Sequence, residues 1–168
     1  MRSDKGDCEL MSLKLEDIMA RNVIRVGEKV TAIKAVEIMN KQGIGCLIAV
    51  RKEKPTGIIT ERDILKKILV KSKDPRQIKV REIMSSPLIL GNPQMGMEEA
   101  VRLMFKRNIK KLPVSDGENL VGLVTLTDLV RSKGILKVLK RLPAEETPKR
   151  MVKIVDRLNR ITAVSRPN

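Results

Sequence analysis

The chain has 168 residues, and its 35 Lys and Arg outnumber its 20 Asp and Glu to give a formal net charge of +15. The absence of histidine excludes a His-based triad, a His general base and a His metal site, and two cysteines without a CxxC pair indicate neither a disulfide framework nor a zinc site. No apolar run reaches the ~18 residues of a membrane-spanning helix, and the N-terminal segment is too charged for a signal peptide, so we expect a cytoplasmic protein without membrane insertion.

The first part of the chain alternates helical and extended patterns. After a flexible segment over residues 1–12, residues 14–19 predict a short helical turn, and residues 22–26 form a β-rich run with alternating apolar positions. Residues 28–43 place Val30, Ile33, Val36 and Met39 at helical spacing and end in Gly43, which predicts an amphipathic helix that stops at a glycine.

A hairpin and a second helix follow. Residues 46–50 and 57–60 are apolar and flank a turn that contains Pro and Gly, which predicts two antiparallel strands. Residues 61–70 predict a helix with Thr60 at its N-cap and Asp63 in its first turn, where a hydroxyl and a carboxylate both suit unpaired amides. These elements make a β-α-β-β-α unit that is too small to cover both faces of its own sheet.

The chain contains this unit twice. The stretch GIITERD at residues 57–63 recurs as GLVTLTD at residues 122–128, and the offset of 65 residues holds without gaps over residues 15–66 with 13 identities in 52 positions. The second copy predicts a helical turn at 80–84, a strand at 87–90, a helix at 97–107, strands at 111–114 and 120–125, and a helix from residue 128. We therefore predict an α+β fold in which repeat one (residues 13–72) and repeat two (residues 73–132) pack about a pseudo-twofold axis.

Residues 133–168 do not belong to the repeat. Residues 131–168 hold 11 basic and 3 acidic side chains, and the last helical pattern carries an apolar stripe beside Lys and Arg. This basic helical extension either packs on the repeats or in a dimer, or it contacts the phosphates of a nucleic acid.

The order of elements resembles the CBS domain, because each unit opens with D/E-I-M (Asp17 to Met19, Glu82 to Met84) and closes with G-h-h-T-x-x-D. Two CBS domains in tandem form a CBS pair, or Bateman module. The resemblance implies a regulatory module without catalytic activity that binds an adenosyl ligand, such as AMP, ADP, ATP or S-adenosylmethionine, in clefts between the repeats. It also implies a homodimer in which helices face one another.

The resemblance implies two clefts, each drawing on both repeats. In each, the Asp of the closing motif accepts hydrogen bonds from ribose hydroxyls, while the Thr hydroxyl and helix N-terminal amides receive phosphate. The first cleft would combine Thr125, Asp128, Asn22, Gly27, Ile44, Gly45 and Cys46, with Lys110 and Lys111 as phosphate cations. The second cleft would combine Thr60, Asp63, Pro87, Asn92, Ile109 and Lys110. Because a pair of cations precedes only one of the two apolar strands, we expect unequal clefts.

The interpretation that these features favour is an adenosine-nucleotide sensor, with no catalytic cofactor, that acts in signal transduction through a change in conformation or in a dimer. Three alternatives remain. The poorest is an enzyme, because no activated nucleophile with a nearby base can be proposed. The Thr and Asp residues can be helix caps and nothing more. The basic extension can make the protein a ligand-regulated DNA- or RNA-binding protein, although no helix-turn-helix, zinc-finger or RRM signature is present.

Overall fold

The computed structural model describes residues 13–132, which divide into two compact units. The first compact unit comprises residues 20–90 and 113–122, and the second comprises residues 13–19, 91–112 and 123–132. The predicted N-terminal segment and the predicted basic extension lie outside the described residues.

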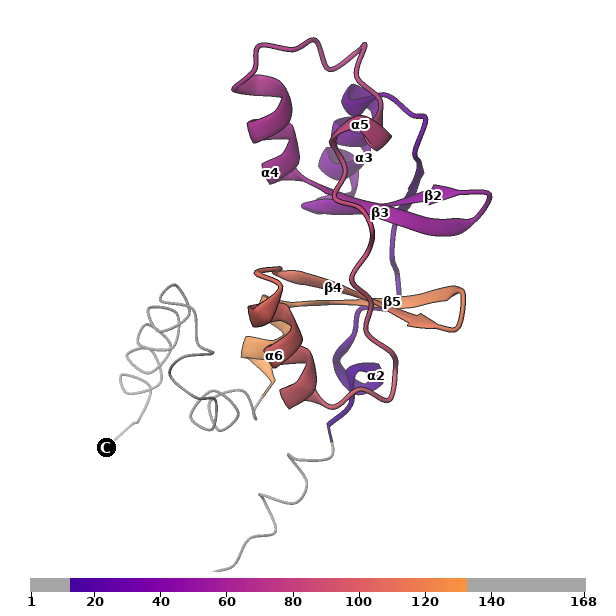
Figure 1. Cartoon of the computed structure of the whole chain (residues 1–168), viewed down its shortest axis with the longest axis vertical. Helices are drawn as coiled ribbons and strands as arrows, with labels where there is room; N and C mark the ends of the chain where they lie inside the picture. Colours follow the sequence, from indigo (N-terminus) through magenta and orange to yellow (C-terminus); the bar gives the residue numbers. More distant parts are fainter. Residues whose placement is uncertain (1–12, 133–168) are drawn as a thin grey trace, which may run out of the picture. The chain divides into compact units, whose positions relative to one another are not determined.

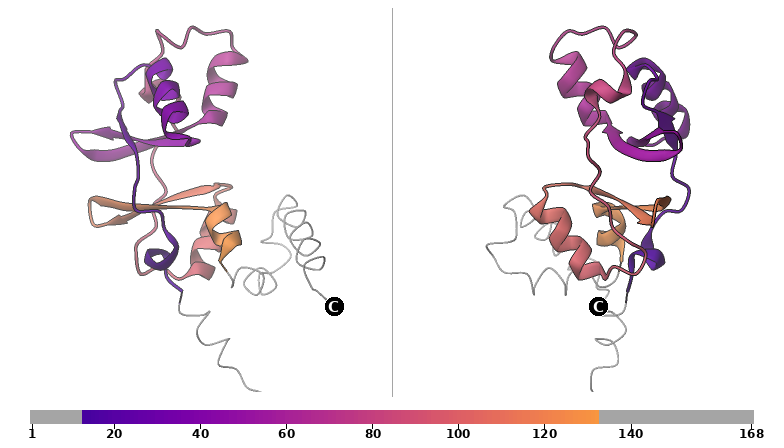
Figure 2. Two further views of the ribbon diagram at one scale, coloured as in Figure 1. Left: turned by 180° about the vertical axis from the view of Figure 1, so that it is seen from behind. Right: turned by 45° about the vertical axis from the view of Figure 1, so that its right-hand side comes forward.

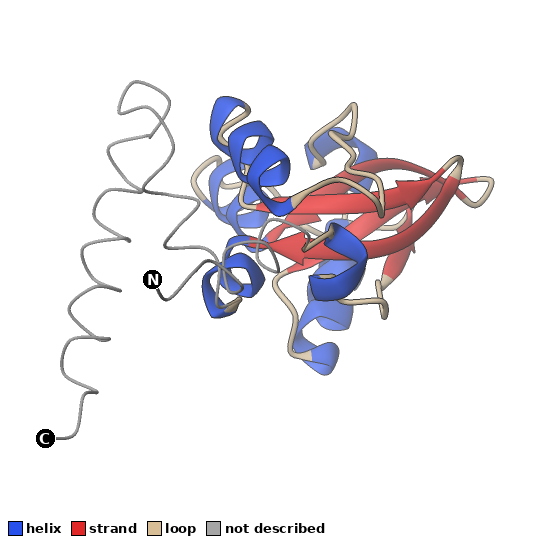
Figure 3. Cartoon of the chain, turned by 90° about the horizontal axis from the view of Figure 1, so that it is seen from below, coloured by secondary structure: helices blue, strands red, loops and turns tan. Residues whose placement is uncertain are grey.

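The first compact unit contains a three-stranded sheet in the order β1-β2-β3 (Figure 1). Strand β1 (Arg25–Gly27) runs parallel to β2 (Cys46–Arg51), and β2 runs antiparallel to β3 (Lys54–Thr60) with Cys46 opposite Thr60. The predicted hairpin is confirmed, and Figure 1 labels its two strands, while Figure 3 draws all strands of the described residues in red. This register places Thr60, the last residue of β3, beside the first residue of β2.

Three helices lie on one face of this hairpin, and the views in Figures 1 and 2 agree on their placement. Helix α3 (Ala32–Gln42) buries Ala32, Ala35 and Met39, which share one face at helical spacing. It starts four residues later than the sequence predicted, because the Val30 N–H donates to Gly27 O in a turn. The core of this unit is aliphatic and includes Val26, Ala32, Ala35, Met39, Leu47, Ala49, Ile59, Ile68, Val80 and Ile83.

The helix predicted over residues 61–70 is present in two parts. Helix α4 (Glu61–Ile64) passes directly into η1 (Leu65–Leu69), where the Val70 N–H donates to Leu65 O, five residues back. Such π-type turns occur inside α-helices and shift the residues that follow them around the helix axis. The turn buries Ile68 and leaves Leu65 and Leu69 exposed.

The second compact unit contains helices α2 (Leu15–Ile18), α6 (Met97–Lys106) and α7 (Leu126–Arg131). Strands β4 (Lys111–Asp116) and β5 (Asn119–Thr125) pair with each other as the second hairpin. In α6, the buried residues Ala100, Val101 and Met104 occupy the positions that are equivalent to Ala35, Val36 and Met39 of α3.

The strand predicted at residues 87–90 is absent, so that prediction was wrong. In repeat one the Ile48 N–H donates to Ile24 O at 3.1 Å as part of the β1–β2 pairing. The residue equivalent to Ile48 is Pro113, which has no N–H and cannot donate this bond to Ile89. One proline in β4 therefore explains why repeat two lacks a strand equivalent to β1.

The opening helix of each repeat packs into the compact unit built mainly from the other repeat. Helix α5 (Val80–Ile83) opens repeat two, yet the Val80 and Arg81 N–H groups donate to Val30 O and Glu28 O at 2.9 Å. Helix α2 opens repeat one, yet the Leu15 N–H donates to Met95 O at 3.0 Å. The compact units are thus not the sequence repeats, whose predicted limits at residues 72 and 132 stay a prediction.

Within residues 13–132, no helix combines the length and the apolar character needed to cross a bilayer.

Candidate ligand-binding site

The closing motif of each repeat forms a capping box at the start of a helix. In repeat one, Asp63 Oδ2 accepts hydrogen bonds from Thr60 N (2.9 Å) and Thr60 Oγ1 (2.7 Å), and Thr60 Oγ1 accepts from Asp63 N (3.3 Å). In repeat two, Thr125 and Asp128 make the same three contacts at 2.8, 2.6 and 3.3 Å. The predicted N-caps are confirmed, and each locks its carboxylate in one orientation.

The capping boxes restrict what each threonine can offer to a ligand. A carboxylate has no proton to donate, so the hydroxyl protons of Thr60 and Thr125 must point to Asp63 and Asp128. A phosphate would then have to be received by backbone N–H groups and cations, since the threonine protons are already committed. The carboxylates keep acceptor capacity for sugar hydroxyls, because each oxygen accepts two hydrogen bonds.

The two aspartates differ in what holds the second carboxylate oxygen. Asp63 Oδ1 forms an ion pair with Lys67 Nζ at 2.8 Å, four residues further along the helix. The residue equivalent to Lys67 is Ser132, whose hydroxyl donates to Leu129 O at 2.5 Å. Asp128 Oδ1 has no hydrogen-bond or ion-pair partner among the side chains that the structure describes.

The residues beside the two capping boxes also differ in charge. The Glu61 N–H donates to Gly45 O at 3.3 Å, and in repeat two the Leu126 N–H donates to Lys110 O at 3.0 Å. The first compact unit therefore places a carboxylate beside a glycine where the second places a leucine beside a lysine. Lys111 adds a second cation in the second unit, where repeat one has the buried Cys46. An anionic ligand group is favoured beside the second capping box.

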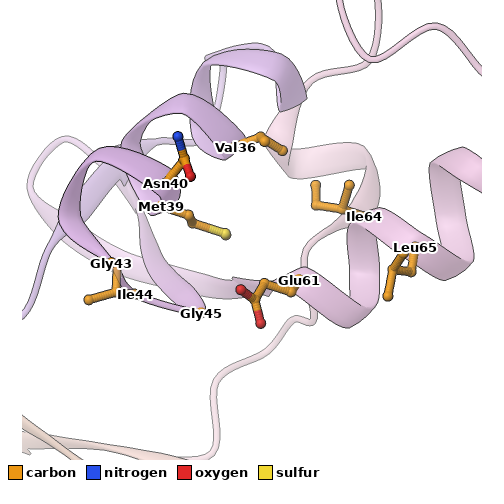
Figure 4. Close-up of a pocket in the computed structure, with 9 residues that line it drawn as sticks. All are labelled: Val36, Met39, Asn40, Gly43, Ile44, Gly45, Glu61, Ile64 and Leu65. Carbon is orange, nitrogen blue, oxygen red and sulfur yellow. The ribbon is translucent and has the colours of Figure 1, made fainter.

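A pocket of about 490 Å³ lies next to the first capping box, between α3 and α4 (Figure 4). Such a volume is within the range of small-molecule sites. In the close-up, Met39 and Ile64 point into the space between the helices, and the Glu61 carboxylate lies beside Gly45. A Cβ on Gly45 would come within 2.9 Å of Glu61 Oε2, so glycine is what lets the carboxylate lie there. The lining residues are Val36, Met39, Asn40, Gly43, Ile44, Gly45, Glu61, Ile64 and Leu65.

The structure gathers the predicted site residues into two groups. The second compact unit holds Thr125, Asp128, Asn92, Ile109, Lys110 and Lys111. The first compact unit holds Thr60, Asp63, Asn22, Gly27, Ile44, Gly45, Cys46 and Pro87. Each predicted cleft draws residues from both units, so the two clefts stay predictions. Ile44 and Gly45 are the predicted residues that line the described pocket.

Sequence reasoning missed three residues that distinguish the two motifs: Glu61, Lys67 and Ser132. A comparison at the 65-residue offset would have found them, because Glu61 aligns with Leu126 and Lys67 aligns with Ser132. The helical spacing of Asp63 and Lys67 is also a known ion-pair signal. What the sequence does not contain is the direction in which each side chain points.

Comparison with known proteins identifies the family. An uncharacterized protein of Methanopyrus kandleri is 36% identical over 73% of this chain, which spans 63% of that relative's length. A CBS domain-containing protein of Bacillus subtilis, YhcV, is 36% identical, and the match covers 68% of this chain and 81% of that protein. A CBS domain pair solved in complex with 5′-methylthioadenosine and S-adenosyl-L-methionine is 30% identical, with a TM-score of 0.65 over 71% of this chain and 94% of that one. The family model of the CBS domain matches twice, at residues 15–70 and 80–134. The chain belongs to the CBS domain family and carries two CBS domains in tandem.

Proposed function

We propose that this protein is a regulatory adenosyl-ligand sensor that binds AMP, ADP, ATP or S-adenosylmethionine through its two Thr-x-x-Asp motifs and performs no catalysis itself. The similar CBS pair in complex with 5′-methylthioadenosine and S-adenosyl-L-methionine supports an adenosyl ligand. Both of those molecules carry a ribose, which matches a pair of carboxylates held in a fixed orientation.

The observation that carries the proposal is the state of Asp128. One oxygen of this carboxylate is fixed by Thr125, and the other has no partner within the described residues. Asp128 is half-buried, and no buried side-chain atom among the described residues lacks a partner, so this oxygen is open to solvent and can accept hydrogen bonds from sugar hydroxyls. Lys110 and Lys111 in the same compact unit supply positive charge for a phosphate.

The proposed ligand site around Asp128 adds Asn22, Gly27, Ile44, Gly45 and Cys46, and the one around Asp63 adds Pro87, Asn92, Ile109 and Lys110. We expect phosphate-bearing ligands to prefer the Asp128 site, because Glu61 beside the other capping box repels them. Ligand binding would then shift a homodimer between two arrangements, by no more than the difference in its affinity for the two.

Thermal-shift measurements against AMP, ATP, S-adenosylmethionine and 5′-methylthioadenosine test this function, because a ligand that binds the folded state raises its stability. We expect Asp128→Asn to weaken binding about tenfold, the value of a hydrogen bond to a charged group. Asp17→Asn is the matched control, since Asp17 occupies the same position in the capping box of α2 and has no proposed ligand role. If Asp128→Asn binds as well as the wild type, the carboxylate does not contact the ligand.

A second candidate function follows from the charge. The 11 basic and 3 acidic side chains over residues 131–168 favour a polyanion, so ligand-regulated DNA or RNA binding is the alternative. Affinity for a duplex should fall steeply between about 50 and 200 mM salt and be lost on deletion of residues 133–168. Binding that survives this deletion would contradict a role for the extension.

A further inference from the structure

Lys67 links three parts of the first compact unit. Its Nζ lies 2.8 Å from Asp63 Oδ1 and donates to Ile83 O, the last residue of α5, at 2.5 Å. The Asp63 side chain is only 12% exposed and that of Lys67 is 38% exposed, so solvent weakens this contact less than it weakens a surface ion pair. The ammonium is thus held between the carboxylate and a helix C-terminus, where positive charge is favourable.

Repeat two provides an internal comparison. The capping boxes at Asp63 and Asp128 match to within 0.1 Å, so the two motifs orient their carboxylates alike. The residue four positions further on is a lysine in one and a serine in the other. Ser132 turns its hydroxyl to Leu129 O, with Met97 Sδ 3.2 Å away, and leaves Asp128 Oδ1 without a partner among the described residues.

This difference decides what a ligand must displace. Thr60 occupies one oxygen of Asp63, and Lys67 takes the other through a charge-assisted hydrogen bond. A ribose hydroxyl that approached this oxygen would either share it with the Lys67 ammonium or displace the ammonium. Displacement of the ammonium would also deprive Ile83 O of its hydrogen-bond donor, which costs further free energy. At Asp128 the same hydroxyl meets an oxygen that is not engaged.

We propose that Lys67 is an internal competitor for the ligand's sugar hydroxyls at Asp63, which makes the Asp63 site the weaker of the two. The inference rests on the proposed function, because it assumes that a ribose binds these carboxylates. Lys67 is a positioning residue in this scheme: it holds Asp63 and α5 together until a ligand displaces it. The Asp128 site fills first, and the Asp63 site fills only at higher ligand concentration.

Isothermal titration calorimetry on the full chain tests the competition with a reciprocal exchange. 5′-Methylthioadenosine is the probe, since it carries the ribose diol without a charge that Lys67 would attract, and its 2′,3′-dideoxy analogue is the matched control ligand. In the Asp128→Asn background, where the other site is weakened about tenfold, Lys67→Ser should tighten the Asp63 site about tenfold and so make it the tighter of the two. In the Asp63→Asn background, Ser132→Lys should weaken binding by a similar factor. Lys66→Ser removes a neighbouring exposed lysine and should change neither.

The controls separate competition from a merely structural role. Lys67→Arg retains the ion pair and should bind like the wild type, and the dideoxy ligand should not respond to Lys67→Ser. Weaker or unchanged binding by Lys67→Ser, in a protein whose circular dichroism matches the wild type, would overturn the inference and leave the proposed function intact. If neither the wild type nor Lys67→Ser binds 5′-methylthioadenosine, AMP or S-adenosylmethionine, the proposed function fails and the inference fails with it.

Discussion

At the scale of single residues, Gly57 lies where two segments of the chain come so close together that only glycine fits. A Cβ at this position would lie 2.5 Å from Met84 Sδ and 3.0 Å from Ser85 O. The chain is this close because Ile58 and Ser85 exchange two backbone hydrogen bonds, at 3.0 and 2.8 Å. Backbone clearance is therefore what requires glycine at this position.

Gly57→Ala should therefore destabilise the protein by about 1 to 3 kcal/mol, because the methyl group forces β3 and the residues after α5 apart. Urea unfolding followed by circular dichroism measures the change. Gly27→Ala is the control, since its Cβ would meet only Val30 Cγ2 at an ordinary 3.5 Å. Equal effects of the two substitutions would show that the contact with Met84 and Ser85 is not the cause.

At the scale of elements, both long helices end in the same way. The Ile44 N–H donates to Met39 O at 3.0 Å, and the Ile109 N–H donates to Met104 O at 2.9 Å. One residue of the connection between helix and strand is left-handed in both, Gly43 with φ of 62° and Asn108 with φ of 51°. This is the Schellman motif, in which glycine is the most favourable residue and asparagine the next. In each repeat this motif precedes the strand, β2 or β4, next to which predicted site residues lie.

Asn108→Gly should stabilise the protein by about 0.5 to 1 kcal/mol, since glycine adopts positive φ without the Cβ penalty. Gly43→Ala should destabilise it by about 1 to 2 kcal/mol for the same reason, although there is space for the methyl group. Thermal unfolding of the two variants measures both changes in stability, a gain for Asn108→Gly and a loss for Gly43→Ala. Destabilisation by Asn108→Gly would mean that the asparagine side chain makes a contact that outweighs the backbone preference.

At the scale of the whole molecule, the first compact unit exposes an apolar patch. Leu65, Leu69 and Val70 are 54%, 59% and 79% exposed and lie together on η1 and the residue after it. Three exposed aliphatic side chains within six residues form an apolar patch of the kind that a binding partner covers. The homodimer expected from the sequence remains a proposal, and these residues are where we expect its interface.

Leu69→Glu should shift the protein towards monomer by at least about tenfold in dissociation constant, because it places a carboxylate in an apolar interface. Sedimentation velocity over a range of protein concentrations measures this shift. Leu90→Glu is the control, since Leu90 is an exposed aliphatic residue outside η1. An oligomeric state that Leu69→Glu leaves unchanged would place the interface elsewhere or show that none forms.

Much of the fold could be predicted because its signals are local. The capping boxes join residues three positions apart, the helix ends join residues five apart, and each hairpin closes through a short turn. The 65-residue repeat also allowed the family and the equivalence of the two motifs to be predicted. The missing strand at residues 87–90 was misjudged, because the repeat suggested a strand whose partner, Pro113, cannot donate the hydrogen bond.

The sequence by itself determined the two copies of the unit, the positions of their caps and the pair of aspartates that a ribose would need. The tertiary structure decided which opening helix packs into which compact unit, and which of the two carboxylates is already occupied. The reason is the separation of the groups involved: Leu15 bonds to Met95, and Lys67 bridges Asp63 to Ile83. Such contacts depend on where distant segments meet, and no local pattern of residue types encodes that meeting.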